Sequence, residues 1–267
     1  MPRANRHHIP GQIWHITHRC HQREFLFKFA KDRKRWLQWL FEAKKRYGLS
    51  ILNYIVTSNH IHLLVVDDES DAISKSLQLI AGRSAQEFNQ RKNRKGAYWE
   101  DRYHATAIER GEHLLRCLVY IDMNMVRAGV VSHPSKWIHS GYHEIQTPPL
   151  RYALIDRSKL VELSGAASDE QLKSMHHEWV ESAIQENQRK RQPAWSEAVA
   201  IGSVGFVERM KQEMGYKAVG RKPMQTDDAC MLREPDSSYI HYFDVEKAGL
   251  GAENSVYLDI NAGESIC

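Results

Sequence analysis

Residues 51–66, with the sequence Ile-Leu-Asn-Tyr-Ile-Val-Thr-Ser-Asn-His-Ile-His-Leu-Leu-Val-Val, are the most informative stretch of this chain. Their apolar residues favour strands and the polar pair Ser58–Asn59 favours a turn, so two short strands joined at that pair are predicted. His60 and His62 stand two apart on the second strand, where side chains two apart share a face. Two imidazoles on one face of an apolar strand suit a divalent metal ion.

The histidine pair is weak evidence by itself, because the chain has 15 histidines among 267 residues. An earlier segment, residues 12–18, alternates as a strand and adds two more. Its alternation places His15 on one face and His18 on the other. Either could approach a metal or a phosphate. More often, the ring nitrogens of such residues find their hydrogen-bond partners within or beside the sheet. Neither is assigned as a ligand.

Composition indicates a soluble globular protein, with 42% hydrophobic and 26% charged residues. The length suits one large domain, or one domain with an appendage. No apolar run approaches the ~20 residues that span a bilayer, and the N-terminus has no apolar signal core. The cysteines favour neither a disulfide framework nor a thiolate zinc site, since they are far apart at Cys20, Cys117, Cys230 and Cys267. We expect a cytoplasmic protein without membrane contact.

Charge is distributed unevenly along the chain. Residues 1–50 carry +9, residues 51–150 sum to zero, and residues 151–267 carry −5. A basic first fifth suggests a polyanion as partner, and the alternative is a solvated charged surface.

Apolar periodicity predicts helices over 31–47, 71–90 and 112–127, and a further strand over 102–109. The last helix has a polar stripe as well as an apolar one, and its members share a face because they are spaced three or four apart. The stripe consists of Arg116, Tyr120, Asn124 and Arg127. A phenol has a pKa near ~10, so a metal and nearby cations would be needed to activate Tyr120 for attack on phosphorus. The alternative is a helix tyrosine with its hydroxyl at the surface.

A basic loop over residues 91–96 is followed at once by Tyr98 and Trp99. Cations beside exposed aromatic rings suit nucleic acid, and the alternative is an exposed turn followed by a core tryptophan. The residues expected to contact phosphates of such a partner are Arg33, Lys34, Arg35, Lys44, Lys45, Arg91, Lys92, Arg94, Lys95, Arg116 and Arg127.

The chain beyond residue 150 is expected to be a mainly helical C-terminal appendage. Thr147-Pro-Pro149 marks the boundary, and helices are predicted from Ser168 to about Arg191 and from Ser203 to Met214. We divide the chain into a domain over 1–150, a helical region over 151–222 with an accessory DNA-binding role as one option, and an acidic, loosely ordered tail over 223–267.

Residues 1–150 resemble the single-tyrosine transposases with an HUH motif, and more narrowly the branch of REP-associated tyrosine transposases. The segments that carry the resemblance are Pro10-Gly11, Trp14-His15-Ile-Thr17, Ser58-Asn-His-Ile-His-Leu-Leu64, Tyr98-Trp-Glu-Asp-Arg-Tyr103 and Tyr120-Ile-Asp-Met-Asn-Met-Val-Arg-Ala-Gly129. Two positions depart from the family pattern: Ser58 and Met125 each stand where proline is common. Neither change removes a reactive group, and a helix without that proline is expected to be straighter.

The resemblance implies a ferredoxin-like α+β fold, with an antiparallel sheet and helices on one face. It implies that His60, His62 and Asn124 bind Mg²⁺ or Mn²⁺ and that Tyr120 is the nucleophile. Tyr120 would cleave single-stranded DNA near hairpin-forming repeats, leaving a 5′-phosphotyrosine and a free 3′-hydroxyl. The protein would act as a monomer or homodimer and would be associated with the nucleoid. Two alternatives stay open: a non-catalytic protein that binds single-stranded hairpin DNA, and a metal-dependent hydrolase in which Tyr120 is structural.

Overall fold

A computed structural model describes residues 9–68, 71–186, 192–226 and 229–233 of the chain. Seven strands among these residues form one sheet in the order β2-β3-β1-β4-β5-β7-β6. Their bounds are β1 Ile13–Arg19, β2 Ser50–Val56, β3 His60–Val66, β4 His104–Ile108, β5 Ala198–Gly202, β6 Lys222–Gln225 and β7 Cys230–Arg233. All neighbours pair antiparallel except β4 and β5.

The first four strands and two helices form the predicted ferredoxin-like core. Helix α1, Ala30–Tyr47, follows β1, and helix α2, Ala72–Lys92, follows β3. The strand order β2-β3-β1-β4 then places the first strand and the third in the middle of the core sheet. The predicted α+β class and antiparallel core sheet are therefore confirmed.

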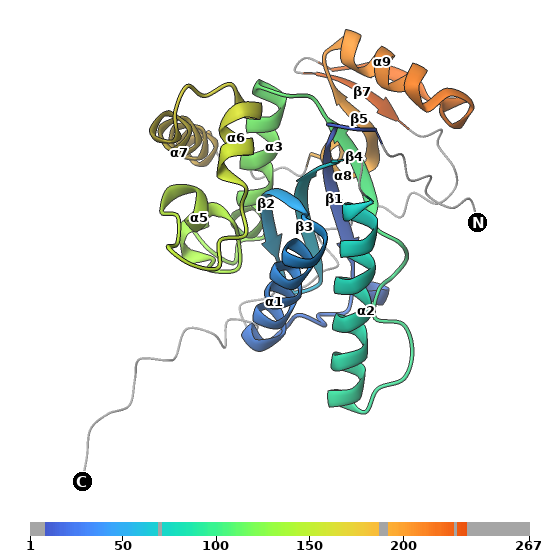
Figure 1. Ribbon diagram of the computed structural model, residues 1–267, viewed down its shortest axis with the longest axis vertical. Helices are drawn as coiled ribbons and strands as arrows, with labels where there is room; N and C mark the ends of the chain where they lie inside the picture. The colour runs from blue at the N-terminus through green and yellow to red at the C-terminus, as the bar shows by residue number, and fades with distance from the viewer. Residues whose placement is uncertain (1–8, 69–70, 187–191, 227–228, 234–267) are drawn as a thin grey trace. The chain divides into compact units, whose positions relative to one another are not determined.

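Helices cover both faces of the sheet, whereas the sequence predicted one covered face. Helices α1 and α2 lie side by side on one face (Figure 1). On that side the ring of Trp99 stacks on His18 of β1 and donates a hydrogen bond to the Ala81 carbonyl of α2. Helix α3, Glu112–Asp122, lies on the opposite face, where Asn53 of β2 contacts its Leu118 carbonyl.

The predicted helix over 112–127 is interrupted. Helix α3 ends at Asp122, and a short helix α4 runs from Asn124 to Arg127 after Met123. Absence of the family's proline therefore does not give a straight helix here. Met125 is buried as predicted, so the second piece remains anchored to the core.

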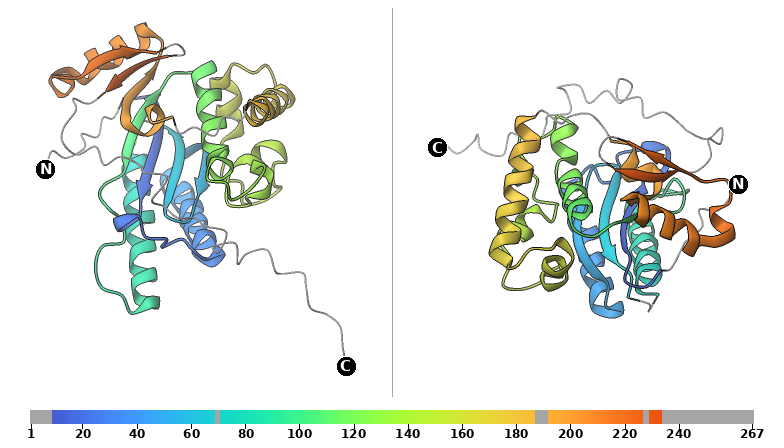
Figure 2. Two further views of the ribbon diagram at one scale, coloured as in Figure 1. Left: turned by 180° about the vertical axis from the view of Figure 1, so that it is seen from behind. Right: turned by 90° about the horizontal axis from the view of Figure 1, so that it is seen from above.

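The region beyond residue 150 combines helices with three strands, so the expectation of a mainly helical appendage was incomplete. Its helices are α6 Arg157–Ser164, α7 Asp169–Gln185, α8 Ala194–Glu197 and α9 Val204–Met214. Strand β5 pairs with β4, and the β6–β7 hairpin follows it, so the sheet continues across the boundary placed at residue 150 (Figure 2). Residues 222–226 and 229–233 belong to this hairpin rather than to a loose tail. The rest of the predicted tail, 234–267, lies outside the described residues.

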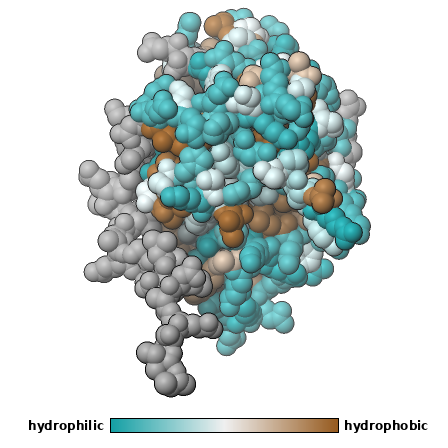
Figure 3. All heavy atoms as spheres, turned by 90° about the vertical axis from the view of Figure 1, so that its left-hand side faces the viewer, coloured by the Kyte–Doolittle hydropathy of each residue, from teal (hydrophilic) through white to brown (hydrophobic). Residues whose placement is uncertain are grey.

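Hydrophilic side chains cover most of the face shown in Figure 3, and hydrophobic ones appear there as separate small groups. Among the described residues, no helix has the length and apolar character that crossing a membrane requires.

A buried polar network holds α3 in place between the sheet and α7. Asp122 at the end of α3 accepts a hydrogen bond from Asn53 at 3.2 Å and contacts Nε2 of His176 on α7 at 2.7 Å. Both side chains of the Asp122–His176 pair are fully buried. At Gly141, an added Cβ would collide with the Asn53 amide oxygen, so the backbone there approaches this network closely.

We expect Asp122→Ala to lower the free energy of unfolding by roughly 3–5 kcal/mol, because it leaves the buried Asn53 and His176 without their partner. Urea unfolding followed by circular dichroism measures this. The matched control is Glu162→Ala, which removes an exposed ion pair with Lys159 and should cost at most about 1 kcal/mol. Equal losses in the two variants would contradict a structural role for the network.

Candidate metal and tyrosine site

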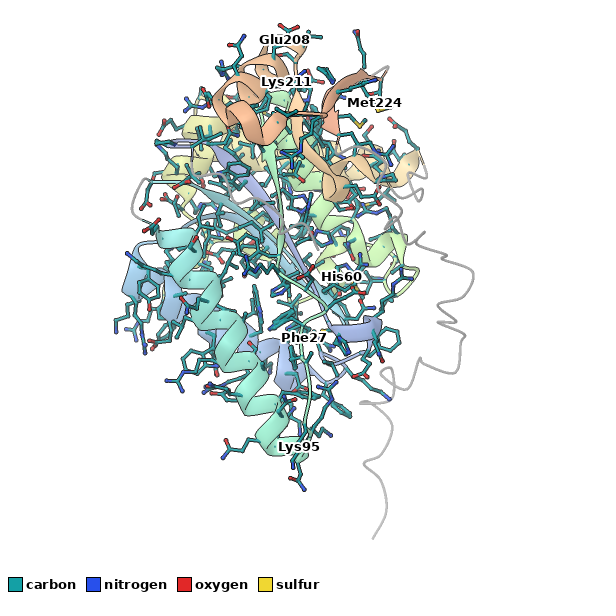
Figure 4. The ribbon with its side chains drawn as sticks, turned by 90° about the vertical axis from the view of Figure 1, so that its right-hand side faces the viewer. Phe27, His60, Lys95, Glu208, Lys211 and Met224 are labelled. Carbon is teal, nitrogen blue, oxygen red and sulfur yellow. The ribbon has the colours of Figure 1, made fainter. Side chains whose placement is uncertain are left out.

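Three side chains from two separate parts of the chain converge on one point. His60 and His62 lie on the same face of β3, because strand side chains alternate. Asn124, the first residue of α4, places its amide nitrogen 3.4 Å from Nε2 of His60 and 3.0 Å from Nε2 of His62. His60 is the first residue of β3 and pairs with Arg19 at the end of β1, and Figure 4 shows it near the middle of the molecule, above Phe27. The structure thus brings together all three predicted metal ligands.

The site fits a divalent metal ion by its donor set. Both Nε2 atoms face Asn124, and a half-turn of the Asn124 amide would present its oxygen at the same point. Two imidazole nitrogens and one amide oxygen leave coordination positions for water and phosphate oxygens, as Mg²⁺ and Mn²⁺ require. No group of three or more His, Cys, Asp or Glu side chains suited to a metal occurs within the described part of the chain.

A third histidine stands behind the site. His15 of β1 is fully buried, and its Nε2 lies 2.9 Å from Nδ1 of His62, with the two rings stacked at 5.0 Å between centroids. Its Nδ1 lies 2.6 Å from the backbone carbonyl of Trp195 in α8. The sequence analysis did not assign His15, although its alternation already placed it on the face opposite Trp14 and Ile16. The sequence alone did not show that β1 pairs with β3, and this pairing is what brings His15 next to His62.

Burial keeps these imidazoles neutral. Desolvation lowers the pKa of His15 from 6.5 to about 3, against a raising effect of its hydrogen bond to the Trp195 carbonyl. Desolvation also lowers the pKa of His62 well below 6.5, and repulsion from His60 and His15 lowers it further. Neutral imidazole is the form that binds a metal.

Tyr120 of α3 stands beside the histidines. Its ring centroid lies 5.9 Å from that of His62 and 6.0 Å from those of both His15 and Trp195. The guanidinium of Arg127 lies over the ring at 4.2 Å and donates a hydrogen bond to the Tyr120 carbonyl at 2.7 Å.

The Tyr120 side chain lines a cavity of about 900 Å³. Arg116 and Arg127 line the same cavity, so three of the four residues of the predicted polar stripe face one space, whereas Asn124 contacts the histidines. Arg116 also forms an ion pair with Glu112 one turn earlier. The far walls come from α7, α8, β5 and β7, which lie beyond residue 150.

Many of the predicted DNA contacts are engaged within the protein. Arg33 is buried and donates to the carbonyls of Phe27 and Lys28, and Lys44 donates to those of Ala153 and Leu154. Others form ion pairs across the surface: Arg35 with Glu87, Arg91 with Asp32, and Arg94 with Glu24. Arg116 and Arg127 line the cavity beside Tyr120. The other four members are exposed lysines, namely Lys34, Lys45, Lys92 and Lys95. That the group contacts phosphates stays a prediction.

Tyr98 and Trp99 do not form an exposed platform after the basic loop. Tyr98 is 3% exposed, and Trp99 stacks on His18 at 3.9 Å between ring centroids. The core alternative considered for this tryptophan therefore applies.

Comparison with known proteins agrees with this geometry. Residues 9–124 match the family model described as "Transposase IS200 like". The match covers less than half of the chain, and over these residues the chain is similar to IS200-like transposases. The matched range contains His60, His62, Tyr120 and Asn124, and it confirms the resemblance predicted from the sequence.

Two solved structures are similar at low identity. One is a REP-associated tyrosine transposase bound to a REP hairpin, with 21% identity, a TM-score of 0.44, and coverage of 54% of this chain and 84% of that chain. The other is a putative transposase from Deinococcus radiodurans, with 16% identity, a TM-score of 0.32, and coverage of 41% and 87%. No curated protein matches the chain.

The lowered pKa of His15 predicts a pH effect on stability. Below pH 6.5 the unfolded chain binds a proton at His15, whereas the folded protein keeps this imidazole neutral until about pH 3. The contribution of the neutral His15 side chain to the free energy of unfolding is therefore fully present above pH 6.5, and it decreases as the pH falls toward 3. Between pH 7 and 5.5, the wild-type protein should lose about 1 kcal/mol more than His15→Gln does. Urea unfolding at each pH measures this, and equal losses would contradict the lowered pKa.

Proposed function

We propose that the protein is a metal-dependent endonuclease and strand transferase of single-stranded DNA. It would cleave near hairpin-forming repeats through a 5′-phosphotyrosine intermediate, as the resemblance to REP-associated tyrosine transposases implies. The observation that carries the proposal is the convergence of His60, His62 and Asn124 beside Tyr120. The rings of His62 and Tyr120 are 5.9 Å apart between centroids. This arrangement supports the proposal, because a metal bound there and the Tyr120 hydroxyl would be close enough to act on the same phosphodiester.

In the proposed reaction, the phenolic oxygen of Tyr120 attacks phosphorus and the bond from phosphorus to the 3′ oxygen breaks. The 5′ phosphate stays on Tyr120, the phenolic proton is lost, and the departing 3′ oxygen gains a proton. His60, His62 and Asn124 would hold Mg²⁺ or Mn²⁺, which supplies charge stabilisation to the phosphate oxygens. Arg127 places a cation over the tyrosine ring, next to the space that the phosphate would occupy. Attack by a 3′-hydroxyl on the phosphotyrosine reverses the steps and rejoins DNA.

A surface near the start of α1 supports binding of unpaired DNA. The ring of Phe29 is 41% exposed, and the amino groups of Lys28, Lys31 and Lys92 lie 6.0, 5.7 and 5.4 Å from its centroid. We call these four residues the Phe29 patch. An exposed ring surrounded by cations suits a stacked base with its phosphates on the lysines. The preceding segment is tied to the metal site, because the Phe27 amide donates to the Ser58 carbonyl just before His60.

The first test of the proposal uses Tyr120→Phe, which keeps the ring and removes the attacking oxygen. Wild-type protein incubated with single-stranded hairpin DNA and Mn²⁺ should form an adduct that survives denaturation, and peptide mapping should find DNA on Tyr120. The variant should bind the same DNA and form no adduct.

The matched control is Tyr142→Phe, another buried tyrosine, which should cleave normally. Cleavage without any adduct would support a water-using hydrolase instead. Binding without cleavage under every metal condition would support the non-catalytic binding protein.

The second test concerns the Phe29 patch. Phe29→Ala should weaken binding of single-stranded DNA by roughly 5- to 150-fold, the equivalent of about 1–3 kcal/mol for one stacked base. Lys92→Ala should reduce the slope of log affinity against log salt by roughly 0.7. Fluorescence anisotropy at several salt concentrations measures both. Tyr152→Ala removes an exposed ring elsewhere and is the control; equal effects at Phe29 and Tyr152 would remove the patch from the binding surface.

A further inference from the structure

The two histidines of the proposed metal site are each held from behind by a hydrogen-bonded chain that ends on a backbone carbonyl. Behind His62 the chain runs through His15 to the Trp195 carbonyl, with contacts of 2.9 and 2.6 Å. Behind His60 it runs through the Asn59 amide to the Arg23 carbonyl, with contacts of 2.7 and 3.3 Å. In both chains the histidine engages through Nδ1.

A carbonyl oxygen only accepts hydrogen bonds, and this decides where the protons lie. The Trp195 carbonyl requires a proton on Nδ1 of His15, so the neutral His15 ring presents a lone pair at Nε2. That lone pair requires a proton on Nδ1 of His62, which leaves a lone pair on Nε2 of His62. One backbone carbonyl therefore sets the tautomers of two rings.

The same reasoning applies to His60. The Asn59 amide nitrogen donates to the Arg23 carbonyl, so the amide oxygen faces His60 and accepts from its Nδ1. The lone pair of His60 then also lies on Nε2. Both Nε2 lone pairs face the Asn124 amide, where the metal would bind.

We propose that His15 is a positioning residue for this metal site, and that α8 takes part in the site by holding His15. The inference rests on the proposed metal function, since His15 acts through His62 and touches no substrate. Trp195 lies well outside residues 9–124, which match the transposase family. Thr106 of β4 lies beside the Trp195 carbonyl, at 3.4 Å, and its hydroxyl donates to the Ala198 carbonyl at 2.7 Å, which links the end of α8 to the sheet.

The proposal predicts a specific effect of removing the acceptor behind His62. In His15→Leu, the Nδ1–H of His62 loses its partner in a buried site, and the proton can move to the nitrogen that binds the metal. Mn²⁺ affinity should fall by roughly 10- to 100-fold, as other losses of a partner behind a metal-ligating histidine do. His15→Gln keeps an amide oxygen as acceptor and should restore part of the affinity.

Mn²⁺ affinity is measured on the full chain without DNA, from the electron paramagnetic resonance signal of free Mn²⁺. The matched control is His18→Leu, which removes a buried histidine from the other face of β1. His18→Leu should bind Mn²⁺ as the wild-type protein does, and thermal unfolding checks that each variant is folded. Wild-type affinity in a folded His15→Leu, or an equal loss in His18→Leu, would overturn the proposal.

A measurement on the unmutated, metal-free protein keeps the proposal testable if His15→Leu does not fold. Nitrogen-15 correlation spectra distinguish the two neutral tautomers of each histidine. We expect His15, His60 and His62 to carry their protons on Nδ1, and a proton on Nε2 of His62 would overturn the proposal. Failure of the adduct assay with normal tautomers and Mn²⁺ binding would instead reject the proposed reaction and leave His15 in its role.

Discussion

The register of β1 against β3 is the constraint on which the candidate site depends. Thr17 pairs with His62 and His15 pairs with Leu64, so His15 and His62 are diagonal neighbours on one face. Because strand side chains alternate, a slip of one residue would turn His15 to the other face and bring Trp14 or Ile16 in its place. The buried apolar residues of both strands oppose such a slip, since it would move Ile16 and Trp14 from one packed layer to the other. Core packing thus fixes a polar arrangement.

The second requirement is the placement of α3 over that face. The β2–β3 ladder shifts register between Ile51 and Asn53, which is a β-bulge. After the bulge Asn53 pairs with Leu64 and faces α3, where it reaches Asp122. Asp122 is two residues before Asn124 and two after Tyr120, so one buried contact locates both. The next residue, Met123, interrupts the helix, and α4 begins at Asn124, which contacts the histidines.

Local patterns were enough to predict much of this structure. Alternation identified the strands and the common face of His60 and His62, and helical spacing grouped Tyr120 with Arg116, Asn124 and Arg127. These signals are periodic and short in range, so they need no knowledge of partners. Whether a basic side chain meets solvent, an acid or a carbonyl depends on tertiary contacts. Arg33 shows this, since it lies in a basic run yet is buried against the Phe27 carbonyl. His15 was overlooked for the same reason, because its role depends on two strands and on α8.

Trp195 connects the later part of the chain to both halves of the candidate site. Its ring lies 6.0 Å from that of Tyr120, and its carbonyl meets His15. The cavity beside Tyr120 is walled on its far side by α7, α8, β5 and β7. If Tyr120 is the nucleophile, a DNA strand that enters this cavity would contact these walls, so residues beyond 150 would help to select the DNA. Residues 9–124, which match the family model, would then carry the reacting groups. Residues beyond 150 would contribute part of the specificity for DNA.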